Sequence, residues 1–168
     1  MTVNELLSAI RKDFHIELDI KNIETFYTRN ELQNKLIEDG LYRTARVSHG
    51  VYIIGEDHKI CYIRSSGKLT RNDKGELQSN GTNGIGSRIL RSSAPNAFLV
   101  DSDNLGWKKI GNDQRKTIQN YLNHIPLSSV SITILPSGQL ILPSVLEFLL
   151  LQVYHANSRD LPMINNQV

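Results

Sequence analysis

Residues 50–64 read GVYIIGEDHKICYIR. This stretch is rich in β-branched and aromatic residues on both sides of the turn-like segment Gly55–His58. Such a pattern predicts two antiparallel strands joined into a hairpin. The fold should therefore be organised around a small sheet that contains this hairpin.

Two tyrosines ten residues apart, Tyr52 and Tyr62, lie on the two predicted strands. With a turn of about four residues between the strands, residues at this spacing approach each other across an antiparallel pair. Two phenols on one face would then reach the same substrate atom. Aromatic residues are also favoured in strands for packing alone, so a structural role for either tyrosine stays open.

Helices and further strands are expected around the hairpin. Capping-box patterns at Thr2–Glu5 and Thr28–Glu31 predict helices over residues 2–13 and 28–39. Alternation predicts a short strand at 16–20 and another at 130–135, and a final helix follows. Further expected elements are a helix start near 85–91, a strand at 97–100 and a helix from Asp113. The order predicts an α/β (α+β) fold in which helices flank a small central antiparallel or mixed β-sheet.

Length and composition indicate one domain. The chain has 168 residues, of which 39% are apolar and 21% charged, and this balance supports one ordinary core. The single cysteine, Cys61, excludes a disulfide within one chain and is expected to be a small core residue. The start of the sequence lacks a secretory pattern, and no segment has the apolar length of a membrane span. We therefore expect a cytoplasmic protein without membrane contact.

The charge is unevenly distributed. Residues 1–58 hold seven Lys/Arg against ten Asp/Glu, whereas residues 59–91 hold seven Lys/Arg against two Asp/Glu. A polyanion would be drawn to this middle segment, although a solvated polar loop has the same composition. Lys68 does not make a nucleotide site, because the residue after it and the preceding glycine spacing differ from a P-loop.

Glu147 is the one acidic residue between 114 and 159. Together with Ser144 it forms a capping-box pattern, so its carboxylate has a purely helical explanation. A single carboxylate also suits Mg²⁺, which keeps much of its water shell and needs few protein ligands. Both interpretations stay open at this point.

Taken in order, these residues resemble the GIY-YIG nuclease superfamily. The resemblance rests on Gly50-Val51-Tyr52, on Tyr62-Ile63, on a later arginine, on Glu147 and on the late Asn165. Arg88 matches the family arginine, and Arg91 is a close rival three residues later. The resemblance covers residues 48–168 and gains most of its weight from the collinear order.

The resemblance implies a DNA nuclease. Tyr52 or Tyr62 would activate or orient water, Glu147 would hold Mg²⁺ or Mn²⁺, and Arg88 and Lys68 would complete the catalytic group. The expected partner is double-stranded DNA. The residues expected to contact it are Arg64, Lys68, Arg71, Lys74, Arg91 and Asn165.

The chain departs from the family pattern in two ways. Arg64 stands where the family has the glycine of Tyr-Ile-Gly, and the Gly-rich insertion 65–87 stretches the distance from Tyr62 to Arg88 to 26 residues. With residues 1–47 as a helical extension for dimerisation or DNA contact, the chain looks most like a type II restriction endonuclease. That subclass implies a homodimer.

Two alternatives come from other classes. The first is a catalytically degenerate nucleic-acid-binding protein that keeps the fold. The second is an unrelated α/β protein in which the tyrosines belong to the core.

Overall fold

The computed structural model describes residues 1–24, 29–39, 49–66, 69–71, 73–75, 77–79, 85, 129–136, 141–162 and 165. The elements expected at 97–100 and from Asp113 lie outside these residues, and so does most of the helix start expected at 85–91. Ile85, the first residue of that segment, is fully buried.

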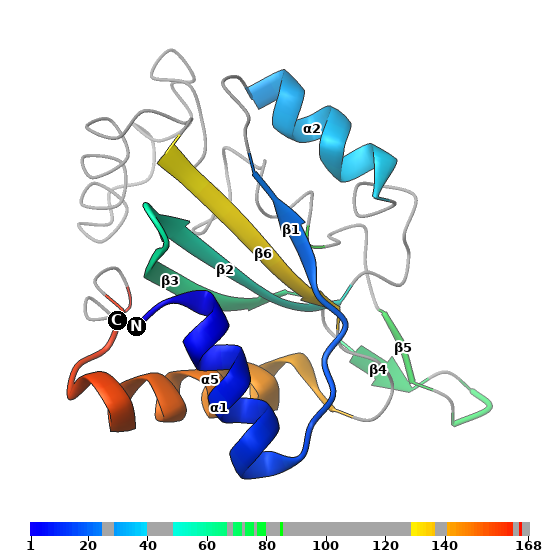
Figure 1. Cartoon of the computed structure of the whole chain (residues 1–168). Coiled ribbons are helices and arrows are strands. Elements are labelled where there is room, and N and C mark those ends of the chain that lie inside the picture. Colours follow the sequence, from blue (N-terminus) through cyan, green and yellow to red (C-terminus); the bar gives the residue numbers. More distant parts are fainter. Residues whose placement is uncertain are drawn as a thin grey trace, which may run out of the picture.

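Four antiparallel strands form the central sheet in the order β1-β6-β2-β3 (Figure 1). Their bounds are β1 Lys21–Ile23, β2 Gly50–Glu56, β3 Lys59–Ser66 and β6 Val130–Pro136. Strand β6 lies between β1 and β2, while β3 is an outer strand. The strands predicted at the hairpin and at 130–135 are confirmed.

The β2–β3 hairpin has a tight turn and one irregularity. Asp57 and His58 both have positive φ, as a two-residue turn between twisted strands requires. Farther along, Ile54 is opposite Tyr62 but Gly55 is opposite Ile60, so β3 contains a bulge. A Cβ at Gly55 would stand 2.9 Å from the Ser131 hydroxyl, which explains the glycine at this close approach.

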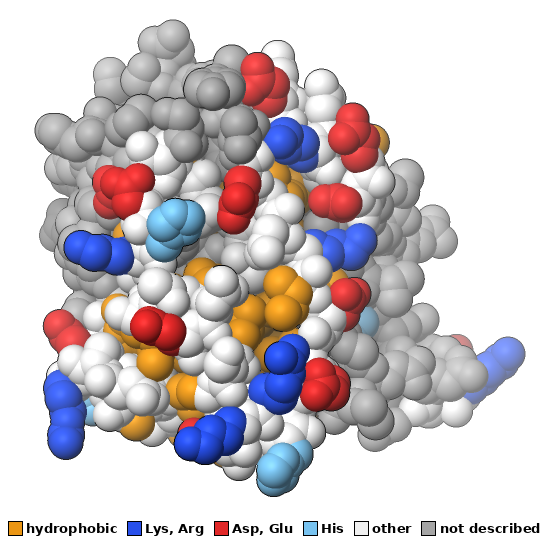
Figure 2. All heavy atoms as spheres, viewed as in Figure 1, with side chains coloured by type: hydrophobic (Ala, Val, Ile, Leu, Met, Phe, Trp, Pro, Cys, Tyr) orange, Lys and Arg blue, Asp and Glu red, His pale blue; other side chains and the backbone are white. Residues whose placement is uncertain are grey.

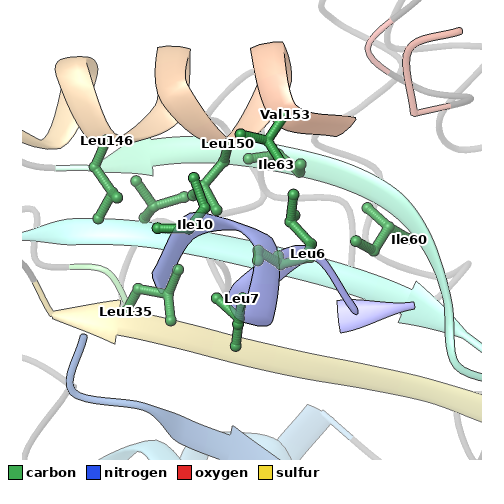
Figure 3. Close-up of a cluster of buried hydrophobic side chains, with 11 residues drawn as sticks. Leu6, Leu7, Ile10, Ile60, Ile63, Leu135, Leu146, Leu150 and Val153 are labelled. Carbon is green, nitrogen blue, oxygen red and sulfur yellow. The ribbon is translucent and has the colours of Figure 1, made fainter. Parts of the chain in front are cut away.

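Helices α1 (Val3–Phe14) and α5 (Pro143–Ser158) pack against one face of the sheet (Figure 1). Figure 3 shows their apolar side chains converging on the hairpin and β6. Burying these aliphatic groups supplies the main stabilisation of this face. The cluster consists of Leu6, Leu7, Ile10, Val51, Ile53, Ile60, Ile63, Leu135, Leu146, Leu150 and Val153.

The start of α1 agrees with its sequence signal. Thr2 is the N-cap, its hydroxyl accepts from the Glu5 amide at 3.2 Å, and its own amide donates to the Glu5 carboxylate at 2.8 Å. Helix α2 (Arg29–Glu38) lies near β1 and buries Leu32 and Leu36. The helices predicted in residues 1–47 therefore form, and α1 contributes directly to the main core.

One local prediction was wrong. Residues 16–20 form no strand, and the strand lies just beyond them at β1, because five alternating residues are a weak signal beside pairing with β6. Within the Gly-rich insertion 65–87, β4 (Leu69–Arg71) and β5 (Leu77–Ser79) pair as a small antiparallel hairpin. Gly75, at φ +78°, lies between these two strands.

The architecture is an α+β fold with a small open antiparallel sheet flanked by helices. This confirms the general class predicted from the sequence. Cys61 is buried, as expected of a small core residue. Among the described helices, none is both long and apolar enough to cross a bilayer.

Candidate functional site at the β3 edge

The two tyrosines lie on one face of the hairpin. Tyr52 is opposite Arg64, and Tyr62 is opposite Ile54, so the phenol rings are diagonal neighbours across the strands. Their centroids are 6.2 Å apart, and the ring planes meet at 57°. The prediction that residues ten apart would approach each other is confirmed. This tilted arrangement is one that aromatic pairs favour.

Both tyrosine side chains are buried. Tyr52 is 0% exposed and Tyr62 is 3% exposed. They lie on the opposite face of the sheet from α1 and α5, because residues in a strand alternate between faces and Val51, Ile53 and Ile63 point into the α1–α5 core. The pair therefore contributes to packing whatever else it does.

Glu147 reaches from α5 to the outer edge of β3. Its Oε2 accepts hydrogen bonds from the Ser65 amide, at 2.8 Å, and from the Ser65 hydroxyl. The Ser65 amide can donate away from the neighbouring strand β2 because β3 is an edge strand of the sheet. The carboxylate thus takes the place that a neighbouring strand would otherwise fill at this position.

The capping-box explanation of Glu147 is wrong. Helix α5 begins at Pro143, its N-cap is Leu142, and no side chain caps it. Proline is well suited to the first helical position, because the amide it lacks would have no helical partner there. Ser144 is then already inside the helix, so the Glu147 carboxylate is available to β3.

Arg64 pairs with the other oxygen of the same carboxylate. Its Nη1 lies 3.6 Å from Glu147 Oε1. The Arg64 side chain is 37% exposed, compared with 14% for Glu147, so this ion pair lies at the border between protein and solvent. Arg64 is also opposite Tyr52 in the hairpin. The residue that pairs with the Glu147 carboxylate is therefore a cross-strand neighbour of one of the two tyrosines.

Asn165 holds a second position on the β3 edge. Its Oδ1 accepts from the Ile63 amide, its Nδ2 donates to the Ile63 carbonyl, and both distances are 2.9 Å. Asn165 is 5% exposed, so its amide substitutes for a paired strand in a buried setting. The DNA contact expected of Asn165 stays a prediction, and the geometry gives this residue a structural role.

For the other residues expected at the site, the roles stay predictions. Lys68, Arg88 and Arg91 lie outside the described residues. Arg71 belongs to β4, and Lys74 is exposed in the segment between β4 and β5. On the face seen in Figure 2, the basic and acidic side chains of the described residues are interspersed, without a basic stripe.

The fit of a divalent cation can be judged at Glu147. The described residues contain no group of three or more His, Cys, Asp or Glu side chains that would enclose a metal. Oε1 nevertheless accepts no hydrogen bond from the described residues, and its contact with Arg64 is long. Glu147 therefore fits as one ligand of a hydrated Mg²⁺, whose other positions water and phosphate oxygens would fill.

Ser65 is a site residue that the sequence analysis did not identify. The signal that would have revealed it is strand alternation, because Ser65 comes two residues after Ile63 on the face that α5 covers. A hydroxyl at such a position needs a polar partner, and Glu147 supplies it.

A separate hollow of about 390 Å³ lies near β1 and α2, and none of the described residues that line it belongs to the site. Among the described residues, three carboxylates and one lysine line it, and this lysine donates to a backbone carbonyl. The described residues that line it are Asn22, Ile23, Glu24, Lys35, Glu38 and Asp39.

In comparisons with known proteins, the chain matches no protein-family model, no curated protein and no solved structure. Its function is therefore inferred from the residues and the fold.

Proposed function

We propose that the protein is a metal-dependent DNA endonuclease of the GIY-YIG type. The observation that carries the proposal is the ion pair between Glu147 and Arg64, which reaches solvent at the β3 edge. Its arginine is the cross-strand neighbour of Tyr52. A carboxylate for a cation and an arginine for a phosphate are complementary tools for phosphodiester hydrolysis.

Each residue has a proposed role. Glu147 holds Mg²⁺ or Mn²⁺, with Ser65 orienting its carboxylate. The cation, when bound, acts as a Lewis acid that polarises a phosphoryl oxygen. Arg64 neutralises phosphate charge, and Tyr52 or Tyr62 orients or activates water. Roles for Lys68 and for Arg88 or Arg91 rest on the sequence alone.

Substrate and assembly are inferred from the resemblance to type II restriction endonucleases. The proposed substrate is double-stranded DNA cut at a specific sequence. A homodimer is the simplest assembly for cutting both strands of a symmetric site.

A second candidate is a non-catalytic DNA-binding protein of the same fold. The burial of both phenols favours it, because a general base must come within hydrogen-bond reach of water. Arg64 in the place of the family glycine favours it too, since a side chain there changes what approaches the backbone. The third hypothesis is an unrelated α/β protein, in which the tyrosine pair serves only to pack the core.

Cleavage of long linear DNA of mixed sequence tests the proposal. The purified protein is incubated with this DNA in Mg²⁺ or in EDTA, together with the variants Glu147→Ala and Tyr52→Phe. Tyr52→Phe keeps the buried ring and removes only the hydroxyl. We expect discrete bands that need the metal and disappear in both variants.

The matched control is Glu17→Ala, which removes an exposed carboxylate that pairs with Arg11 on the surface. This variant should cut like the unmodified protein. Intact DNA in the presence of good binding would favour the non-catalytic reading. Failure to bind DNA even at low salt, where phosphate contacts are strongest, would favour the unrelated protein.

A further inference from the structure

The two oxygens of Glu147 are held in different ways. Oε2 accepts from both the amide and the hydroxyl of Ser65, so its position is fixed by the backbone of β3. Oε1 faces only the Arg64 guanidinium among the described residues, and the separation is 3.6 Å. Oε2 is thus held in place by Ser65, while the charge on Oε1 is neutralised by the Arg64 guanidinium.

We propose that Arg64 is an internal counter-cation that exchanges with the divalent metal at Glu147 Oε1. In the metal-free protein the guanidinium neutralises the carboxylate. When a divalent cation binds, Arg64 is displaced toward solvent, where it meets a DNA phosphate. This inference rests on the proposed function for its metal and its DNA, and it adds a link between the binding of the two.

The geometry of the ion pair makes the exchange feasible. Charge-assisted hydrogen bonds between arginine and carboxylate are about 2.7–2.9 Å long, and the Arg64 pair exceeds this. Partly exposed pairs contribute little stability, so breaking this one costs little. Arg64 is also more exposed than Glu147, so it has room to move while the carboxylate stays in place.

Electrostatics makes the exchange necessary. A divalent cation and a guanidinium at the same carboxylate oxygen would repel each other strongly at this distance. The two hydrogen bonds from Ser65 do not oppose the exchange, because they bind the other oxygen. The metal therefore meets an oriented ligand and has to displace only the arginine.

Titration of the DNA-free protein with Mn²⁺ tests the exchange. Paramagnetic broadening of the Ser65 amide signal in NMR spectra reports Mn²⁺ at Glu147 even when binding is weak. Unmodified protein is compared with Arg64→Gln, which removes the charge and keeps much of the length. The control Arg11→Gln also removes one positive charge, but from the surface pair with Glu17.

Arg64→Gln should lower the Mn²⁺ concentration for half-maximal broadening by about threefold to tenfold, because a competing cation is lost. Arg11→Gln should leave this concentration unchanged, and Glu147→Gln should abolish the broadening. An unchanged or higher concentration for Arg64→Gln overturns the exchange. So does the absence of Glu147-dependent broadening in both the unmodified protein and Arg64→Gln.

The exchange and the proposed function can fail separately. Tighter Mn²⁺ binding in Arg64→Gln, with no DNA cleavage by the unmodified protein, would support the exchange and refute the nuclease. Cleavage that needs Glu147, with Mn²⁺ binding insensitive to Arg64, would support the nuclease and refute the exchange.

Discussion

The starts of α1 and α5 carry the same sequence pattern but use it differently. In Thr2–Glu5 the glutamate bonds back to the residue that caps its own helix. In Ser144–Glu147 the glutamate bonds to Ser65, which lies 82 positions away in the sequence. One carboxylate serves its helix, and the other joins a helix to a strand.

The difference arises from where each helix begins. Thr2 has extended backbone angles and lies outside α1, so Glu5 occupies the third helical position, from which a side chain reaches the N-cap amide. Pro143 starts α5 one residue before Ser144, which moves Glu147 into the second turn. A helix that does not use its acidic residue at its own start leaves that residue available for the fold or for chemistry.

The largest effect on stability is expected where a polar side chain replaces a whole strand partner. Asn165→Ala would leave the Ile63 amide and carbonyl without the amide that now satisfies both. We expect the free energy of unfolding in urea to fall by about 2–3 kcal/mol, since buried backbone groups lose their hydrogen bonds.

Asn157→Ala is the control for this change, because the Asn157 amide donates within α5, to the Val153 carbonyl four residues earlier. It should cost well under half as much. Equal losses in the two variants would contradict the view that the long-range hydrogen bonds at the β3 edge contribute more to the free energy of unfolding than the local bond in α5.

Removing the other long-range link should have a smaller effect. Glu147→Ala leaves the Ser65 amide and hydroxyl without their acceptor, but water can reach this partly exposed position. We expect a loss of about 1–2 kcal/mol in the free energy of unfolding. Ser65→Ala, which removes only the hydroxyl bond, should lose less, and a greater loss in Ser65→Ala would show that Glu147 is not held as described.

The helix starts themselves can be compared through their hydroxyls. Thr2→Ala should destabilise the protein by about 1 kcal/mol because it removes a working N-cap. Ser144→Ala should change the stability very little, since α5 has no side-chain cap and alanine is a good helix former. Thermal unfolding of the two variants measures this difference in stability. A similar loss in both variants would mean that Ser144 does cap α5.

Local signals were enough to predict much of the fold. The Thr2 cap, the β2–β3 hairpin and β6 are encoded by residues close together in the sequence, and each was found there. The approach of Tyr52 and Tyr62 was also predictable, because a hairpin turn fixes which residues face each other.

The features that the sequence could not reveal depend on contacts between distant segments. The bonds from Glu147 to Ser65 and from Asn165 to Ile63 span 82 and 102 positions. No local pattern marks either pair, and at Glu147 the local pattern pointed to a different role. The burial of the tyrosines was equally hidden, because strand propensity is the same for a packed and for an exposed aromatic residue.

The smallest expected effect concerns the titration of Glu5. Hydrogen bonds from the Thr2 amide and hydroxyl lower the pKa of Glu5, because they favour the charged carboxylate. A carboxylate whose pKa is lower in the folded state stabilises that state above its unfolded pKa, and the contribution is lost as the pH falls through the folded pKa. The start of α1 should therefore become less stable only in acid.

NMR titration of the Glu5 side chain should give a midpoint below the ordinary glutamate value, and Thr2→Ala should move that midpoint upward. If the midpoint does not respond to Thr2→Ala, the Thr2 amide alone lowers the pKa of Glu5. The start of α1 would then differ from the start of α5 by only one hydrogen bond to the glutamate.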